Sequence, residues 1–221
     1  MNEFVDLFSN TDTAAVSTSV KLLLLLTVLA LAPSILILMT SFTRIVIVLS
    51  FVRTSLATQQ TPPNQLLIGL ALFLTFFIMA PTFHDVNETA LQPLFNDEIS
   101  LEEAYENAAE PIKEFMAKHT REKDLALFMN YSEMDPPESL EDIPLTTLVP
   151  AFAISELKTA FQMGFMIFIP FLVIDMAVAS VLMSMGMMML PPVMISLPFK
   201  ILLFVLVDGW YLITYSLLEG F

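Results

Sequence analysis

Four long apolar runs limit the folds open to this chain more than any other feature of its sequence. They cover residues 22–52, 66–83, 161–190 and 199–218. About 20 apolar residues suffice for a helix to cross the hydrocarbon core of a bilayer. Over the whole chain 56% of residues are hydrophobic and 14% are charged, whereas about a quarter are charged in soluble domains. The runs therefore predict an all-α membrane protein.

Two of these runs are longer than one simple crossing requires. The run 22–52 contains 31 residues and would extend roughly 46 Å as a straight helix. It either projects beyond the membrane or bends back at Pro33. The run 161–190 is interrupted by Pro170 and Asp175. We therefore expect long, kinked hydrophobic helices arranged as helical hairpins.

The charges are concentrated in one segment. The chain carries a formal net charge of −14, and residues 85–147 hold 16 acidic and 4 basic side chains. Cytoplasmic loops favour Lys and Arg, and Arg53 and Lys200 flank the polar turns at 53–65 and 191–198. Both turns are therefore predicted to face the cytoplasm. The acidic insert and both termini are predicted to lie on the extracytoplasmic side.

The composition divides the chain into four segments. They are a polar N-terminal segment (1–20), a first hydrophobic helical pair (21–84), the acidic extracytoplasmic helical insert (85–147) and a second hydrophobic helical pair with a Met-rich loop (148–221). The first segment has three acidic residues and no basic one. A cleaved signal peptide needs a positive start, so we expect an internal signal anchor at the following apolar run.

The insert itself is predicted to be helical. Ser100 and Glu103 have the spacing of a capping box, in which each side chain pairs with the other residue's backbone N–H. Apolar side chains follow at steps of three and four residues, at Leu101, Tyr105, Ala108, Ile112 and Phe115. Pro111 is expected to kink or break this helix, and residues 125–129 offer a second apolar face. Because so small a hairpin buries little core alone, we expect it to pack on the rest of the chain or on a neighbouring subunit.

Several classes of function are disfavoured by the composition. A net-acidic chain without a basic tract has no electrostatic footprint for nucleic acid. The sequence has no cysteine for a thiolate metal site, and its five glycines are too sparse for a phosphate-binding loop. The two histidines, His84 and His119, share no metal-ligand spacing. We therefore expect no cofactor, no metal and no enzymatic activity.

The charged residues inside or beside the apolar runs are the first candidates for function. An unpaired charge in a membrane costs at least about 2.5 kcal/mol. We therefore expect these residues to pair across helices or subunits, or to line a wet cavity. The candidates are Arg44, Glu156, Lys158, Asp175, Lys200 and Asp208. For Glu156, Lys158 and Lys200 the alternative is that they only mark the membrane interface.

A methionine-rich segment is the second candidate. Nine of the fifteen methionines fall within residues 163–194, and they are densest at Met183, Met185, Met187, Met188 and Met189. Three consecutive methionines between Gly186 and the Pro191–Pro192 pair cannot share one helical face, so the stretch predicts a flexible loop. Apolar filling of a buried helix end is the alternative. Unbranched methionine side chains repack around different shapes, so copies of the loop around a ring would form a deformable apolar gasket across a pore.

Several motifs, in the same order and spacing, resemble the family of flagellar biosynthetic proteins FliP. The longest is PAFAISELKTAFQMGF at residues 150–165. The others are TRIVIVL at 43–49, QTPPNQ at 60–65, MMMLPP at 187–192, LPFK at 197–200 and VDGW at 207–210. The resemblance extends over about residues 20–218.

This resemblance implies a function. It implies a subunit of the flagellar type III protein export gate, a pore that passes unfolded flagellar subunits across the cytoplasmic membrane at the basal body. It also implies a homo-pentamer that assembles with FliQ and FliR into a helical complex raised out of the bilayer plane. Met187, Met188 and Met189 match the family's pore gasket, and Met183 and Met185 are added because they are adjacent.

Two other functions stay open from the sequence. A small-solute or ion carrier could place Arg44, Asp175 and Asp208 around a wet cavity. Carriers are expected to show an internal repeat, and no matching residue pattern relates the two hydrophobic pairs. A purely structural membrane scaffold predicts that the methionine loop tolerates polar replacement without effect.

Overall fold

The computed structural model describes residues 13–221 apart from 59, 133–136, 138, 140–141 and 188. Every regular element in these residues is a helix. The chain forms two compact units, Met1–Ile37 and Leu38–Phe221. The predicted all-α class is therefore confirmed over the described part of the chain.

The described part of the first unit belongs to helix α2 (Thr13–Met39). The helix is not interrupted at Pro33, where a bend was one of two expectations, because one proline removes a single backbone hydrogen bond. The interruption lies at Thr40–Ser41, before α3 (Phe42–Ser55). There the Thr40 hydroxyl accepts a hydrogen bond from the Phe42 N–H (3.3 Å), so a side chain replaces regular helical pairing.

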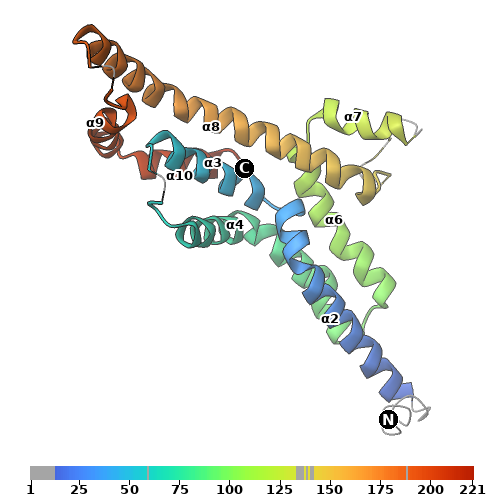
Figure 1. Ribbon diagram of the computed structural model, residues 1–221. Helices are drawn as coiled ribbons and strands as arrows, with labels where there is room; N and C mark the ends of the chain where they lie inside the picture. Colours follow the sequence, from blue (N-terminus) through green and yellow to red (C-terminus); the bar gives the residue numbers. More distant parts are fainter. Residues whose placement is uncertain (1–12, 59, 133–136, 138, 140–141, 188) are drawn as a thin grey trace, which may run out of the picture. The chain divides into compact units, whose positions relative to one another are not determined.

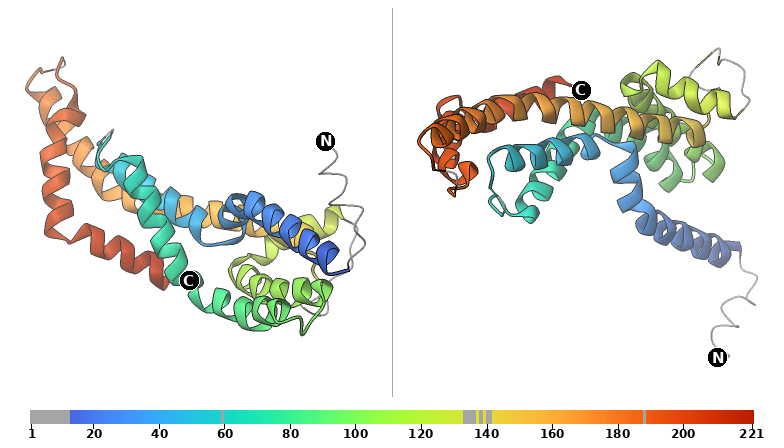
Figure 2. Two further views of the ribbon diagram at one scale, coloured as in Figure 1. Left: turned by 90° about the horizontal axis from the view of Figure 1, so that it is seen from below. Right: turned by 45° about the horizontal axis from the view of Figure 1, so that its top comes forward.

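The second unit is built around one long helix, α8 (Leu145–Ser184). α3 lies along it, and the helices from the acidic insert pack near its first half (Figure 1; Figure 2). The remaining elements are α4 (Asn64–Val86), the π-helical turn η1 (Asn87–Leu91), α5 (Gln92–Phe95), α6 (Leu101–His119), α7 (Glu122–Tyr131), α9 (Pro192–Leu206) and α10 (Gly209–Glu219).

Two helical segments in the described residues are long and apolar enough to cross a membrane. They are Asn64–Phe95, formed by α4, η1 and α5 (32 residues), and α8 (40 residues). The number rises to four if the end of α2 with α3, and α9 with α10, each form one broken span. The axes of α9 and α10 differ by 61°. The first segment extends beyond the apolar run 66–83 at both ends, and α8 begins 16 residues before the run 161–190 and ends at Ser184, before that run does.

α3 and α8 run in the same direction and share a dry seam. Arg44 meets Glu156 near the start of α3, and the rings of Phe51 and Phe161 meet edge to face at 5.4 Å one to two turns later. On α3 the seam is made by fully buried side chains at helical spacing, namely Ile45, Val48, Leu49 and Val52. In a chain that crosses a membrane four times, the first and third crossings run in the same direction. The parallel arrangement of α3 and α8 is consistent with that topology.

The first insert helix begins and continues for reasons visible in its side chains. The predicted capping box is confirmed, since Glu103 N–H donates to Ser100 Oγ (3.2 Å) and Ser100 N–H donates to Glu103 Oε2 (2.8 Å). These bonds from Ser100 lower the pKa of the Glu103 carboxyl. Pro111 was expected to kink or break the helix. There is no break, because α6 runs through Pro111 to His119, and the kink stays a prediction.

A side chain of α6 takes up a hydrogen bond that a proline forgoes. Pro93 has no N–H for the Thr89 carbonyl, and Asn107 Nδ2 donates to that carbonyl (3.0 Å). The Thr89 hydroxyl donates within its own helical turn, to the Asp85 carbonyl (2.8 Å). Asn107 therefore links α6 to the π-helical turn.

The insert packs on the chain itself rather than standing alone. Met116 of α6, together with Ile143, Leu148 and Phe152 beside or in α8, forms a second buried cluster. The composition borders at 84/85 and 147/148 both fall inside helices, α4 and α8. The four-segment division therefore describes composition, and as a division into domains it stays a prediction.

Candidate functional site: two charge clusters and a methionine loop

Helix α8 carries two acidic side chains inside its apolar length. Glu156 and Asp175 are 19 residues apart, which is about 28 Å along the helix. That distance is close to the thickness of a bilayer's hydrocarbon core, about 30 Å. Each acid meets a base from another helix, so the charges come in two clusters at opposite ends of the α3–α8 seam.

The first cluster is the ion pair between Arg44 on α3 and Glu156. Arg44 Nε donates to Glu156 Oε2 (2.9 Å), and Nη2 pairs with Oε1, so the contact is bidentate. Arg44 is 4% exposed and Glu156 is fully buried. A planar guanidinium suits a buried carboxylate because both donors are aligned at once. The sequence prediction that Arg44 needs a partner is met inside the same chain.

The last two residues cover this ion pair. Arg44 Nη1 donates to the Gly220 carbonyl (2.7 Å), and the Arg44 guanidinium carbon lies 3.8 Å from the centre of the Phe221 ring. The Phe221 ring also stacks on Phe115 of α6 (6.0 Å, interplanar angle 14°). A cation over an aromatic face is favourable, more so when water is excluded. One arginine thus ties together α3, α8 and the residues after α10.

His119 completes the shell around Phe221. Its Nδ1 lies 2.8 Å from the Phe115 carbonyl and its Nε2 lies 3.4 Å from the Phe221 carbonyl oxygen. Burial lowers the pKa of His119, and the hydrogen bond to Phe115 only partly offsets this while the Arg44 charge lowers the pKa further. The neutral imidazole is therefore the form that this cluster favours.

The second cluster holds Asp175 between α8, α9 and α3. Lys200 Nζ donates to Asp175 Oδ2 (2.6 Å) and to the Ser55 carbonyl (3.1 Å). Ser196 Oγ donates to Asp175 Oδ1 (2.5 Å). Lys200 is 2% exposed, whereas the Asp175 side chain is 22% exposed. Ser196 precedes Lys200 by one helical turn, so α9 presents both donors on one face.

Two of the six predicted charges are not buried by this chain. Lys158 lies on the exposed face of α8, and Asp208 lies at the break between α9 and α10. Within the described residues neither takes part in an ion pair. Asp208 has a left-handed backbone (φ 51°), which turns the chain between the two helices. For these two residues, pairing with another subunit or lining of a wet cavity stays a prediction.

The methionine stretch forms the connection between α8 and α9. α8 ends in a left-handed glycine, Gly186 (φ 76°). Its N–H donates to the Met183 carbonyl (3.0 Å), and the Met187 N–H donates to the Leu182 carbonyl (3.0 Å). This is the Schellman pattern, which satisfies the last helical carbonyls through backbone alone. α9 then starts at Pro192.

The loop methionines point outward rather than into the chain. Met189 is 98% exposed, and Met183, Met185 and Met187 are 63%, 62% and 38% exposed. Within this chain they therefore do not fill a buried helix end. Met188 lies outside the described residues.

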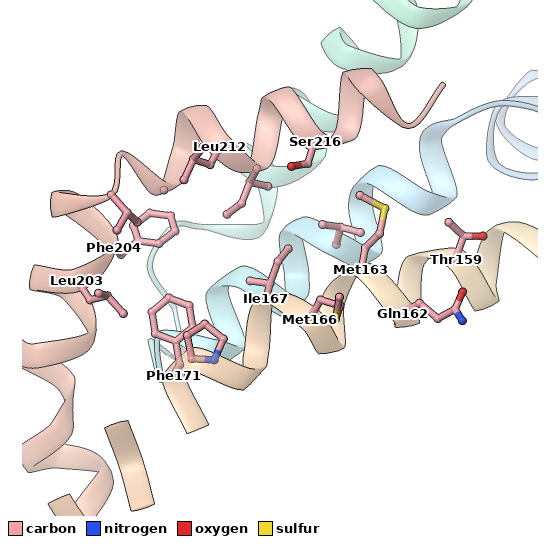
Figure 3. A pocket seen from close by; sticks show the side chains of 15 residues that line it. Thr159, Gln162, Met163, Met166, Ile167, Phe171, Leu203, Phe204, Leu212 and Ser216 are labelled. Atoms are coloured by element: carbon pink, nitrogen blue, oxygen red, sulfur yellow. The ribbon is translucent and has the colours of Figure 1, made fainter. Parts of the chain in front are cut away.

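An apolar cavity of about 650 Å³ lies along α8 on the side of α9 and α10 (Figure 3). Its walls come from side chains such as Met163, Ile167, Phe171, Phe204 and Leu212, with Thr159, Gln162 and Ser216 gathered toward one end. Arg44, Asp175 and Asp208 are not among its lining residues. This cavity therefore lacks the charged lining that a carrier of ions would need.

A third polar network involves none of the residues predicted from the sequence. Arg121 pairs with Asp124 at the start of α7, and Ser155 of α8 donates to Asp124 Oδ2 (2.6 Å). Burial raises the pKa of Asp124, but the hydrogen bonds from Ser155 and Arg121 outweigh it and hold the pKa below its ordinary value. The spacing of Arg121 and Asp124 on one helical turn was a usable signal. The participation of Ser155, 31 positions away, had no local signal.

The described residues bring no three His, Asp or Glu side chains together in an arrangement that could hold a metal ion. The fold and these clusters define a class of protein, a helical membrane protein whose buried charges are neutralised by partners within the chain and whose apolar faces are left open. Residues 25–217 match the FliP family. The chain belongs to that family, and it is a component of the flagellar protein export apparatus.

Individual relatives agree over nearly the whole length. The chain is 79% identical over 221 residues to the flagellar biosynthetic protein FliP of Bacillus subtilis (strain 168), and the match covers 100% of both chains. It is 57% identical over 203 residues to that of Pectobacterium carotovorum subsp. carotovorum, which covers 92% of this chain and 79% of the relative. It is 52% identical over 206 residues to that of Aquifex aeolicus (strain VF5), which covers 92% and 86%.

Proposed function

We propose that the chain forms the protein-conducting pore of the export gate as a homo-oligomer with FliQ and FliR. In this proposal it conducts unfolded flagellar subunits across the cytoplasmic membrane at the basal body and catalyses no reaction. The 85–147 insert lies on the extracytoplasmic side. The methionine loop acts as a deformable gasket that excludes water and ions when no substrate is present.

The observation that carries this proposal is the loop between α8 and α9. Its fold depends on Gly186, two backbone hydrogen bonds and the following prolines, so the methionine side chains are not needed to hold it closed. They project from the chain, with Met189 almost wholly exposed. Flexible thioether side chains that cover no core of their own are suited to close against one another around a ring and to yield to a passing chain.

The exposed apolar surface supports an oligomer. Bulky side chains such as Phe73, Phe77 and Met166 are 78%, 71% and 70% exposed along helices that could lie in a membrane. Exposed apolar surface of this extent needs lipid or protein to cover it. Copies of the same chain and the partner proteins cover it in the proposed assembly.

The test replaces loop methionines and measures ion leak and protein export on the same cells. M187A/M189A, extended to M188A, should raise ion leak about tenfold or more while the complex still assembles, because alanine leaves a gap where an apolar seal must close. The matched control is M166A/M176A, which removes two exposed methionines from the helix body (70% and 66% exposed). An assembled loop variant that stays sealed would overturn the gasket proposal and favour a structural scaffold.

A further inference from the structure

All the oxidisable sulfur in this chain is thioether sulfur. The sequence has fifteen methionines and no cysteine. The methionines differ in exposure: Met79, Met116 and Met129 are buried at 1%, 0% and 7%, whereas those of the α8–α9 connection are open, as are Met166, Met176 and Met194 on the helices. Because oxidation of methionine follows access of the oxidant to sulfur, the structure provides sensitive and resistant thioethers in one molecule.

The sensitive group can change chemically without loss of the fold. The Schellman bonds from Gly186 and Met187 use backbone atoms, and Pro191 and Pro192 start the next helix. Met187 is the least exposed described thioether of the loop at 38%, and Met189 is the most exposed at 98%. A polar atom added to these side chains therefore enters solvent and not the core of the protomer.

We propose that the loop is a redox-sensitive modification site, at which a peroxide oxidises Met183, Met185, Met187 and Met189 to methionine sulfoxide and thereby opens the seal to water and ions. This regulation rests on the proposed gasket. A seal across a pore has water on both of its faces, and peroxide reaches the loop thioethers from there. The thioether sulfur attacks one peroxide oxygen and the O–O bond breaks. An S–O bond forms, and the departing hydroxide takes a proton to give water when the oxidant is hydrogen peroxide. The sulfur is oxidised by two electrons and the peroxide is reduced by two.

The physical consequence follows from the change in polarity. A sulfoxide is polar and chiral, and its oxygen is a hydrogen-bond acceptor that retains water. A gasket excludes ions only while its facing surfaces are apolar, so each sulfoxide adds a wet point to the seal. The modification is reversible, because methionine sulfoxide reductases return the thioether. The seal of an oxidised gate should therefore recover when such an enzyme and its reductant are supplied.

The experiment uses the assembled export gate in sealed membrane vesicles that are exposed to graded hydrogen peroxide. Peptide mass spectrometry reports the sulfoxide fraction at each methionine, and an ion-sensitive dye reports leak in the same samples. The loop methionines should reach half-oxidation at about tenfold lower peroxide exposure than Met79 and Met116, given their difference in access. Leak should rise with loop oxidation and fall again after treatment with sulfoxide reductase.

A leucine variant provides the control. Replacing all five methionines at positions 183, 185 and 187–189 with leucine keeps apolar volume but removes the sulfur. This variant should stay sealed in peroxide. The M166L/M176L variant, which keeps its loop methionines, should leak in peroxide as much as the gate with all its methionines. Loop oxidation no faster than that of Met79 and Met116, or oxidation without leak, would overturn the inference. If the alanine variants leak but oxidised gates do not, the redox proposal fails and the gasket proposal stands. If the alanine variants do not leak, the gasket proposal fails as well.

Discussion

Glu156 and Asp175 are both acids on α8 that are neutralised by a base from another helix, but their settings differ. Glu156 is fully buried and meets a bidentate arginine. The remaining donor of Arg44 binds the Gly220 carbonyl, and the Phe221 ring covers the guanidinium. Asp175 keeps 22% of its side chain exposed and meets a lysine, which is a single point charge that also binds a backbone carbonyl. The chain encloses the first cluster almost completely and leaves the second partly exposed.

The difference indicates separate tasks for the two ends of the α3–α8 seam. A buried charge that loses its partner has no solvent to replace it, whereas a partly exposed carboxylate can be hydrated. The closed cluster joins α3, α8, α6 and the last residues. The open cluster lies at the end of α8 from which the methionine loop continues. In the proposed gate, the closed cluster would hold the assembly at one end of α8, and the open cluster would lie beside the loop that yields.

The largest effect is expected from breaking the closed cluster. Glu156→Gln should lower the free energy of unfolding by about 3–5 kcal/mol, because Arg44 then stays buried without a countercharge. Denaturant unfolding of the detergent-solubilised protein measures it. The double variant R44M/E156L should recover most of the loss, since it removes both charges. A loss below about 1 kcal/mol for E156Q would contradict the closed setting.

Breaking the open cluster should cost less. Asp175→Asn should lower the free energy of unfolding by about 2 kcal/mol, because Lys200 keeps its bond to the Ser55 carbonyl and water can reach position 175. Asp208→Asn, at an exposed position, serves as the control and should change stability little. The comparison between the two ends of α8 fails if D175N is as damaging as E156Q in the same unfolding assay.

The seam between the clusters can be tested by adding one methyl group. A Cβ on Gly164 would lie 2.5 Å from the ring of Phe51, so in Gly164→Ala either the Phe51 side chain or α3 must shift. Overpacking of this kind costs about 1 kcal/mol or somewhat more. Gly69→Ala is the matched control, because no heavy atom lies within 4 Å of the added Cβ. An unchanged unfolding midpoint for G164A would show that the seam is looser than the structure has it.

The smallest effect concerns pH and should occur at the closed cluster. The folded protein lowers the pKa of His119 from its ordinary 6.5 through burial, so folding favours the neutral ring. This contribution to stability is fully present above about pH 6.5 and is lost as the pH falls through the lowered folded pKa. Unfolding measured at several pH values should show a shallower acid decline for His119→Gln. An identical pH dependence in both proteins would remove His119 from this role.

The sequence predicted which charged residues need a partner, but it did not predict which residues the partners are. Buried charges were expected to pair because isolated ones are costly in a membrane, and Arg44 and Asp175 do pair. The identity of the partners had no local signal, since Arg44 and Glu156 are 112 positions apart. Lys158 illustrates the limit, because its place beside Glu156 in sequence turns it to the opposite, exposed face of the helix.

Local patterns also failed where a distant segment supplies a hydrogen bond. Pro93 leaves the Thr89 carbonyl without a local N–H, and Asn107, 18 positions away, donates to that carbonyl. The capping box of Ser100 and Glu103 was predictable because both partners lie within one turn. The difference is whether the compensating group is near in sequence.

The sequence alone determined the helical class, the membrane-length apolar segments, the start of α6 and the family, because these depend on composition, periodicity and order of motifs along the chain. Only the tertiary structure decided which acid meets which base, and it brought Gly220 and Phe221 onto Arg44. It also showed that the methionine loop is closed by backbone bonds with its side chains directed outward. The physical reason is that hydrogen bonds, ion pairs and burial depend on distance in space, which a linear pattern specifies only within a few helical turns.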